Sequence, residues 1–297
     1  MAVLGVIGGS GLYDLPGLRD LEWREVTTPF GAPSDRLLRG RLGDLDIVFL
    51  PRHGRGHRLT PGAINYRANI DALKREGVTD IISLSACGSL REDLVPGTFV
   101  LVDQFIDRTL AREKSFFGAG CVAHVSMAEP VCNRLGDTVA AALDGLSVPW
   151  RRGGTYLAIE GPQFSTKAES ALYRQWGAEV IGMTNMPEAK LAREAEICYA
   201  TVAMVTDYDC WHETHAAVDV PAILRVVAQN AANGRALVAR VAELLARNRP
   251  APCASGCDRA LDDAIVTAPE FRDPAFCARL DAVAGRVLFR ESETGKA

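Results

Sequence analysis

The chain has 297 residues, 48% of them hydrophobic and 24% charged, which is an ordinary composition for a globular protein. Its formal net charge is −4 and no block of Lys or Arg stands out, so nucleic-acid binding has no electrostatic support. No apolar run approaches the ~20 residues that a membrane span needs, and the N-terminus does not resemble a signal peptide.

The chain begins with a predicted strand, residues 3–7, which runs into the glycine-rich segment 8–11. This segment is not a dinucleotide fingerprint, because Asp14 stands where the third glycine belongs, and it is not a Walker loop, because no Gly-Lys-Ser/Thr follows. A nest of backbone N–H groups with the hydroxyl of Ser10 suits a single phosphate. A plain glycine-rich turn is the ordinary alternative.

A predicted hairpin, residues 37–42 and 46–50, leads into the basic loop 52–58, which holds three Arg and two His. The His-x-x-x-His spacing is compatible with zinc, but the flanking guanidinium groups would repel a cation and no third ligand is close in sequence. Arg52 and His53 after a strand suit an oxyanion, to which arginine gives a forked pair of donors. A solvated basic loop remains the alternative.

Predicted strands and helices then alternate along the chain. The strands span residues 80–85, 98–102, 154–160, 179–182 and 199–205. The helices span residues 64–76, 187–196, 221–246 and part of 126–145, with Glu129 and Pro130 in the first turn of the last. Another helix starts at a capping box, Thr166 with Glu169, and runs to Trp176. Residues 103–115 are predicted to be a polar loop.

Two carboxylates follow the strand 199–205 at once, Asp207 and Asp209, flanked by Tyr208 and Trp211. Ligands of open α/β sheets lie just past the carboxyl ends of strands. Two acids there suit a ligand with ring nitrogens and N–H groups, such as a purine base. The ordinary alternative is that both acids face water in a loop.

The alternation predicts an α/β fold: a single domain with a central mixed β-sheet flanked by helices, over residues 1–248. Six strand ends, at residues 8, 51, 86, 161, 183 and 206, open into Gly, hydroxyl, Arg/His or Asp residues, which indicates one cleft at one edge of the sheet. Residues 249–297 form a C-terminal extension of unknown role, with one predicted helix over 274–288.

Eight cysteines in strand-like or helix-like surroundings favour reduced thiols and a cytoplasmic protein. The extension contains two of them, in the spacing Cys253-x-x-x-Cys257. A redox or metal pair is disfavoured there, because no second Cys/His pair lies nearby in the sequence.

As a set, these segments resemble the family of trimeric purine nucleoside phosphorylases and methylthioadenosine phosphorylases. The resemblance covers roughly residues 3–245, and residues 250–297 have no counterpart in it. The matching segments are residues 7–12, 28–34, 52–55, 85–90, 103–109, 127–130, 159–165, 183–188 and 206–211. The resemblance implies the fold of this family and a homotrimer.

The resemblance also implies roles for individual residues. Phosphate would be bound by Ser10, Arg52, His53, Ser85, Ala86 and Thr184. The nucleoside would be bound by Met183, Phe164, Ser165, Val220, His124, Asp207 and Asp209, with His124 coming from a neighbouring subunit. The two acids would also be the catalytic groups.

The implied reaction is phosphorolysis of methylthioadenosine, and also of adenosine, by a pentosyltransferase of purine and methionine salvage. Inorganic phosphate is the co-substrate, and no metal or organic cofactor is implied. Two Asp at the base favour adenine, because an ionised carboxylate cannot donate to a 6-oxo group. The alternatives are a 6-oxopurine nucleoside or methylthioinosine phosphorylase, a nucleosidase that uses water, and a non-catalytic nucleoside-binding module.

Overall fold

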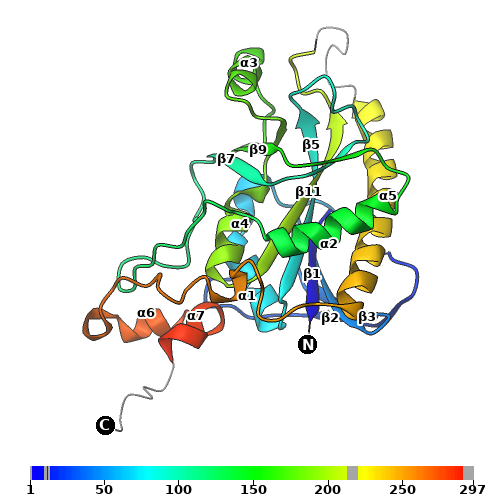
Figure 1. Cartoon of the computed structure of the whole chain (residues 1–297). Coiled ribbons are helices and arrows are strands. Elements are labelled where there is room, and N and C mark those ends of the chain that lie inside the picture. Colours follow the sequence, from blue (N-terminus) through cyan, green and yellow to red (C-terminus); the bar gives the residue numbers. More distant parts are fainter. Residues whose placement is uncertain (1, 10–11, 13, 213–219, 290–297) are drawn as a thin grey trace.

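A mixed β-sheet forms the centre of the chain (Figure 1). The computed structural model describes residues 2–9, 12, 14–212 and 220–289. The strands are β1 (Val3–Gly8), β2 (Leu18–Arg24), β3 (Leu37–Leu42), β4 (Leu45–Pro51), β5 (Asp80–Ser89), β6 (Phe99–Leu101), β7 (Gln104–Arg108), β8 (Trp150–Arg152), β9 (Thr155–Ile159), β10 (Val180–Gly182) and β11 (Cys198–Asp207). The helices are α1 (Tyr66–Arg75), α2 (Asn133–Asp144), α3 (Lys167–Gln175), α4 (Asn185–Glu194), α5 (Val220–Arg247), α6 (Pro274–Ala278) and α7 (Asp281–Leu288).

Strand β5 lies at the centre of this sheet and pairs with β1, β10 and β11. The main path runs β2-β3-β4-β1-β5-β10-β9-β7, and β11 pairs with both β5 and β6. Strands β4, β1, β5 and β11 run parallel, so their carboxyl ends lie at one end of the sheet, at the top of Figure 1. This arrangement confirms the predicted mixed α/β fold and the predicted shared edge.

Helices cover both faces of the sheet. On one face α1 and α4 close a core with residues such as Ile70, Leu73 and Ala189. On the other face α2 and α5 close a second core with residues such as Leu135 and Val241. Apolar residues recur at intervals of three and four residues in α1 and α5, which is the pattern that predicted these two helices.

Several predicted elements differ from the structure. Residues 103–115 contain a strand, β7, because these residues pair in parallel with β9, which no local pattern indicates. Strand β5 continues to Ser89 instead of ending at Ser85, because its second half pairs with β10 and β11. Helix α2 starts at Asn133, after Glu129 and Pro130, because the side chain of Cys132 caps it by accepting from the N–H of Leu135. The capping box at the start of α3 is confirmed.

The C-terminal extension packs against the core, at the lower left of Figure 1. It holds two short helices, α6 and α7, where one was predicted. Leu280 and Val283 join the core under α1 and α4, and Arg286 Nε donates to Glu196 Oε2 at 2.7 Å. Within the described ranges, no helix has both the length and the apolarity to span a membrane.

Candidate active site

Three hydroxyl groups converge beside β5. The Oγ of Ser85 lies 3.4 Å from the hydroxyl of Tyr156 and 3.5 Å from Oγ1 of Thr184. All three residues are buried. Thr184 occupies the N-cap of α4, but its side chain caps no backbone N–H, so its hydroxyl remains available. A hydroxyl cluster at the start of a helix suits an anion.

Gly182 makes room for this hydroxyl cluster. A Cβ at this position would lie 1.8 Å from the hydroxyl oxygen of Tyr156. We therefore expect Gly182→Ala to displace Tyr156 and its neighbour Ser85, and to lower kcat/KM by about 10–100-fold. The matched control is Gly136→Ala in α2, where the nearest atom to the added Cβ is 3.8 Å away and alanine favours the helix. Equal kinetics of both variants and the parent would contradict this role of Gly182.

The guanidinium group of Arg52 is bound to a buried carboxylate. Its Nε donates to Glu188 Oε2 at 2.9 Å and its Nη2 to Glu188 Oε1 at 3.2 Å, while Nη1 donates to the carbonyl of Leu84 at 3.0 Å. The hydroxyl of Ser83 also donates to Glu188. Glu188 therefore accepts from Nε and Nη2 of Arg52 in this arrangement, and donation from Arg52 to an oxyanion stays a prediction. The ion pair fixes the loop after β4 against β5 and α4.

His53 is held as a neutral ring. Its Nδ1 lies 2.9 Å from the carbonyl oxygen of Leu59, which can only accept, so Nδ1 carries the proton. Burial, helped by the charges of Arg52 and His57, lowers the pKa of His53 to about 4. At neutral pH its Nε2 is therefore an acceptor, suited to the O–H of hydrogen phosphate rather than to a bare oxyanion.

The two acids meet at an irregularity in β11. The pairing of β11 with β5 shifts between Val205 and Asp207, as in a β-bulge, and such bulges re-aim side chains. Oδ1 of Asp207 accepts from the backbone N–H of Asp209 at 2.8 Å, and Oδ2 lies 2.6 Å from the hydroxyl of Thr206. Asp209 is buried, with a φ of 53°. Burial raises the pKa of Asp209, and the charge of Asp207 adds to this.

Ser85 of the hydroxyl cluster and Asp207 lie on the neighbouring strands β5 and β11. Ser85 pairs with Ala203, and Gly88 pairs with Asp207. The two pairs are three positions apart in the strand, about 10 Å along the sheet. This span fits a nucleoside with an anion beneath its sugar.

Three further predicted residues border this region. Met183 precedes Thr184, and its side chain lies against Gly161, where an added Cβ would come within 2.6 Å of its sulfur. The carbonyl of Ser165 accepts from the thiol of Cys210 at 3.2 Å, beside Asp209. The buried Oγ of Ser165 has no hydrogen-bond partner among the described residues. Phe164, which precedes Ser165, is 67% exposed.

The remaining predicted residues are placed as follows. Ala86 is exposed on β5 beside Ser85. His124 is exposed, and its backbone N–H donates to the carbonyl of Ala264 in the extension at 2.8 Å. None of the described contacts connects His124 to the acids of the same chain. Ser10 lies outside the described residues, and Val220 is described only as the first residue of α5.

The aromatic neighbours of the acids anchor their loop. The indole N–H of Trp211 donates to the carbonyl of Ser89 at 2.7 Å, and the guanidinium of Arg174 lies 3.6 Å from the centre of a Trp211 ring. The rings of Tyr208 and Trp211 meet nearly at right angles, with their centres 5.9 Å apart. These contacts hold the acid loop against β5, a role that the sequence did not indicate.

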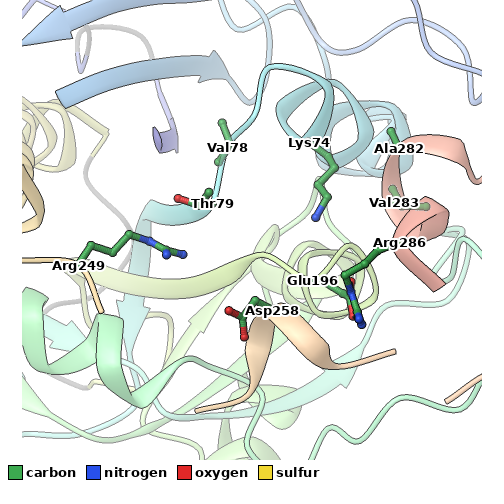
Figure 2. A pocket seen from close by; sticks show the side chains of 9 residues that line it. All are labelled: Lys74, Val78, Thr79, Glu196, Arg249, Asp258, Ala282, Val283 and Arg286. Atoms are coloured by element: carbon green, nitrogen blue, oxygen red, sulfur yellow. The ribbon is translucent and has the colours of Figure 1, made fainter. Parts of the chain in front are cut away.

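A cavity of about 230 Å³ lies at the other end of the sheet (Figure 2). Val78 and Thr79, which precede β5, line it together with Glu196 before β11. Lys74 and Arg249 bring positive charge, but Arg249 is paired with Asp80. The cavity therefore belongs to the amino ends of the strands and is separate from the candidate active site.

Comparison with known proteins identifies the family. Residues 3–243 match the family model described as the phosphorylase superfamily. The chain belongs to this superfamily. This phosphorylase is 64% identical over 286 residues to the S-methyl-5′-thioadenosine phosphorylase of Rhodospirillum rubrum, with 96% of this chain and 97% of the relative covered. It is also 64% identical to the S-methyl-5′-thioadenosine phosphorylase of Bradyrhizobium diazoefficiens, with 97% and 98% covered.

Solved structures agree with this assignment. The phosphorylase superimposes with a TM-score of 0.90 on a methylthioadenosine phosphorylase from an antarctic soil metagenomic library, at 46% identity and with 95% of this chain and 98% of the other covered. A Schistosoma mansoni adenosine/methylthioadenosine phosphorylase mutant in complex with methylthioadenosine gives 0.76 at 38% identity, with 84% and 93% covered. Because the first match spans 95% of this chain, it includes most of residues 249–297. The expectation that the extension has no counterpart is therefore wrong.

Proposed function

We propose that this phosphorylase cleaves S-methyl-5′-thioadenosine with phosphate, releasing adenine and 5-methylthioribose 1-phosphate. One observation carries the proposal. A buried hydroxyl cluster suited to an anion, at Ser85 and Thr184, lies about 10 Å along the sheet from the paired acids Asp207 and Asp209. Near full-length similarity to methylthioadenosine phosphorylases supports the choice of nucleoside.

In the proposed mechanism, the hydroxyl cluster and His53 position the attacking phosphate, and the two acids assist the departure of the purine. Phosphate, held by the hydroxyls of Ser85 and Thr184 and by Nε2 of His53, attacks the anomeric carbon and offsets the positive charge that develops on the sugar. The purine takes up the electrons of the breaking C–N bond and needs a proton at N7. Asp209 is suited to hold that proton because its pKa is raised by burial, and Asp207 accepts from base N–H groups. Phosphate is the co-substrate in this scheme, and no step needs a metal or an organic cofactor.

The decisive assay follows adenine release from methylthioadenosine with and without inorganic phosphate. Release that depends on phosphate, with formation of 5-methylthioribose 1-phosphate, supports the proposal. Release at the same rate without phosphate would indicate a nucleosidase that uses water. Faster turnover of inosine or methylthioinosine would indicate a 6-oxopurine enzyme, and binding without product would indicate a nucleoside-binding module.

The hydroxyl cluster should control phosphate affinity. We expect the double variant Ser85→Ala/Thr184→Val to raise the KM for phosphate by about 10–100-fold, because each lost hydrogen bond to a charged group costs ~1.5–3 kcal/mol. The dissociation constant for methylthioadenosine should change by less than about 3-fold, since the acids are untouched. Steady-state kinetics with phosphate varied, together with calorimetry of nucleoside binding, check both values. An unchanged KM for phosphate would show that phosphate does not bind at this cluster.

The proposal includes a cytoplasmic homotrimer. Phe164 at the border of the site is 67% exposed, which leaves apolar surface there for a neighbouring copy to cover. His124, which makes no described contact with the acids, is exposed as well. Eight free cysteines support a reducing compartment. Light scattering of the active enzyme tests the assembly, and a fully active monomer would contradict it.

A further inference from the structure

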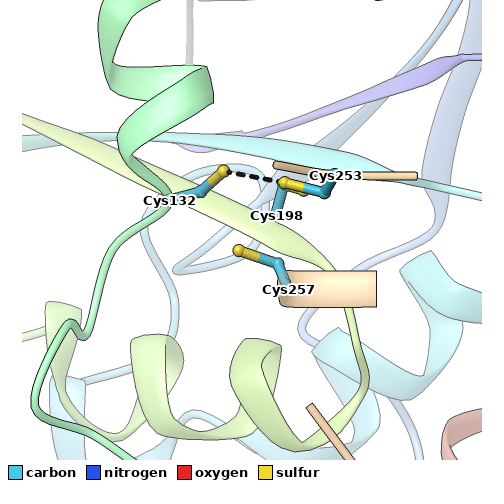
Figure 3. A group of neighbouring side chains, drawn as sticks. All are labelled: Cys132, Cys198, Cys253 and Cys257. Atoms are coloured by element: carbon cyan, nitrogen blue, oxygen red, sulfur yellow. Dashed lines mark hydrogen bonds between the residues drawn. The ribbon is translucent and has the colours of Figure 1, made fainter. Parts of the chain in front are cut away.

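Four buried cysteines gather at the amino end of β11, opposite the candidate active site (Figure 3). They are Cys132 at the N-cap of α2, Cys198 at the first position of β11, and Cys253 and Cys257 in the extension. Their sulfur atoms all lie within 4.8 Å of one another. All four residues are about 1% exposed. The second cysteine pair, which has no place near residues 253–257 in the sequence, comes from the core as Cys132 and Cys198.

The spacing of the sulfur atoms fits a tetrahedral metal site. Four thiolates at ~2.3 Å from one zinc ion lie about 3.8 Å apart, along the edges of a tetrahedron. The sulfur atoms of Cys132 and Cys253 are 3.6 Å apart. The extension contributes a Cys-x-x-x-Cys pair, a ligand spacing that is typical of structural zinc sites.

The surroundings of the cluster offer donors and positive charge to thiolates. The backbone N–H of Leu135, in the first turn of α2, donates to the sulfur of Cys132 at 3.4 Å. Nη1 of Arg193 donates to the sulfur of Cys257 at 3.4 Å. Arg134 interacts electrostatically with Cys198, and its buried Nε and Nη1 have no hydrogen-bond partner among the described residues. Groups of this kind orient and stabilise metal-bound thiolates.

We propose that Cys132, Cys198, Cys253 and Cys257 bind one zinc ion that fastens the C-terminal extension to the core. Binding converts four thiols to thiolates and releases four protons, so the occupied site carries a charge of −2. The guanidinium groups of Arg134 and Arg193 offset that charge. We choose zinc because four cysteines in a tetrahedral arrangement are typical of structural zinc sites.

The site is structural in this proposal. Four protein ligands fill the coordination sphere and leave no position for a substrate. Cys198 begins β11 and Asp207 ends it, so about 30 Å of strand separates the metal from the acids. Loss of the metal should therefore loosen the extension without removing the chemistry at the other end of the sheet.

The first test measures metal in the full-length enzyme, expressed with zinc in the medium and purified under reducing conditions. We expect about one zinc ion per chain by elemental analysis, released when the four thiols are modified with a mercurial reagent. Cobalt(II) in place of zinc should give the intense visible bands and near-ultraviolet charge-transfer band of a tetrahedral tetrathiolate. Enzyme without bound zinc and without this cobalt spectrum, or disulfide-linked peptides joining these four cysteines, would overturn the proposal.

The second test compares two cysteine variants of the extension. Cys257→Ser should lose zinc at least about 10-fold more readily to a chelator than the parent, and its extension should be cut faster by protease. Cys277→Ser is the matched control, because Cys277 is a buried cysteine of the extension outside the cluster. It should keep its zinc. Equal zinc content in both variants would overturn the proposal, whatever their stability.

Discussion

The double substitution Asp207→Asn/Asp209→Ala is expected to lower kcat/KM for methylthioadenosine by about 10³–10⁴-fold. Removal of a general acid costs roughly 10²–10⁴-fold, and the lost acceptor for base N–H groups adds to this. The fold should survive, because Asp207 is only half-buried and asparagine can still accept from the N–H of Asp209 or its replacement. Initial-rate kinetics with adenine detection measure the effect.

The two single variants separate base recognition from proton transfer. Asp207→Asn should shift the ratio of kcat/KM toward 6-oxopurine nucleosides, because an amide can donate to the 6-oxo group and a carboxylate cannot. Asp209→Ala should lose rate on adenine and hypoxanthine nucleosides alike. Asp93→Asn is the control, since Asp93 is an exposed acid paired with Arg91. If Asp207→Asn/Asp209→Ala were as active as this control, the two acids would have no part in catalysis.

Local patterns predicted much of the fold. The signals for three helices are local in the sequence: the apolar spacing of α1 and α5 and the capping box of α3. Those helices could therefore be located from the sequence. The polar ends of the parallel strands also follow one another along the chain, and their common edge follows from the parallel arrangement. Within the candidate site, this was enough to place Ser85, Thr184 and Asp207 near one another.

Contacts between distant segments could not be predicted. Strand β7 exists because β9, about 50 residues later in the chain, pairs with it, and residues 104–108 have no strand pattern of their own. The cysteine cluster joins positions from 132 to 257, and the sequence offers only the Cys253-x-x-x-Cys257 half of it. The family resemblance ended near residue 245, so it gave no indication that the extension is shared by relatives.

Glu188 lies near the start of the predicted helix 187–196, and in the structure its carboxylate forms a buried ion pair with Arg52 beside the site. Arg52 and Glu188 side chains are each 3% exposed and stand 136 residues apart in the chain. The sequence predicts phosphate as a ligand of Arg52, and no local signal links its guanidinium to a carboxylate in α4. Their pairing fixes α4, whose N-cap is Thr184, against the loop that carries His53.

This pairing predicts the largest loss of stability of any substitution near the site. We expect Glu188→Leu to lower the free energy of unfolding by about 3–5 kcal/mol, because it leaves the charge of Arg52 buried and uncompensated. The double variant Arg52→Met/Glu188→Leu should recover most of that loss, since an apolar pair needs no counter-charge. Chemical denaturation of the parent and both variants measures the difference.

The exposed pair of Glu243 and Arg247 in α5 provides the control, and Glu243→Leu should cost less than about 1 kcal/mol. If Glu188→Leu were no more destabilising than Glu243→Leu, the buried pair would not hold the site together. Activity separates phosphate binding, which the sequence predicts for Arg52, from the ion pair with Glu188, which only the structure shows. A stable Arg52→Met/Glu188→Leu enzyme whose KM for phosphate is within about 3-fold of the parent would show that phosphate is held by the hydroxyls of Ser85 and Thr184, and that the ion pair beneath them only positions these groups.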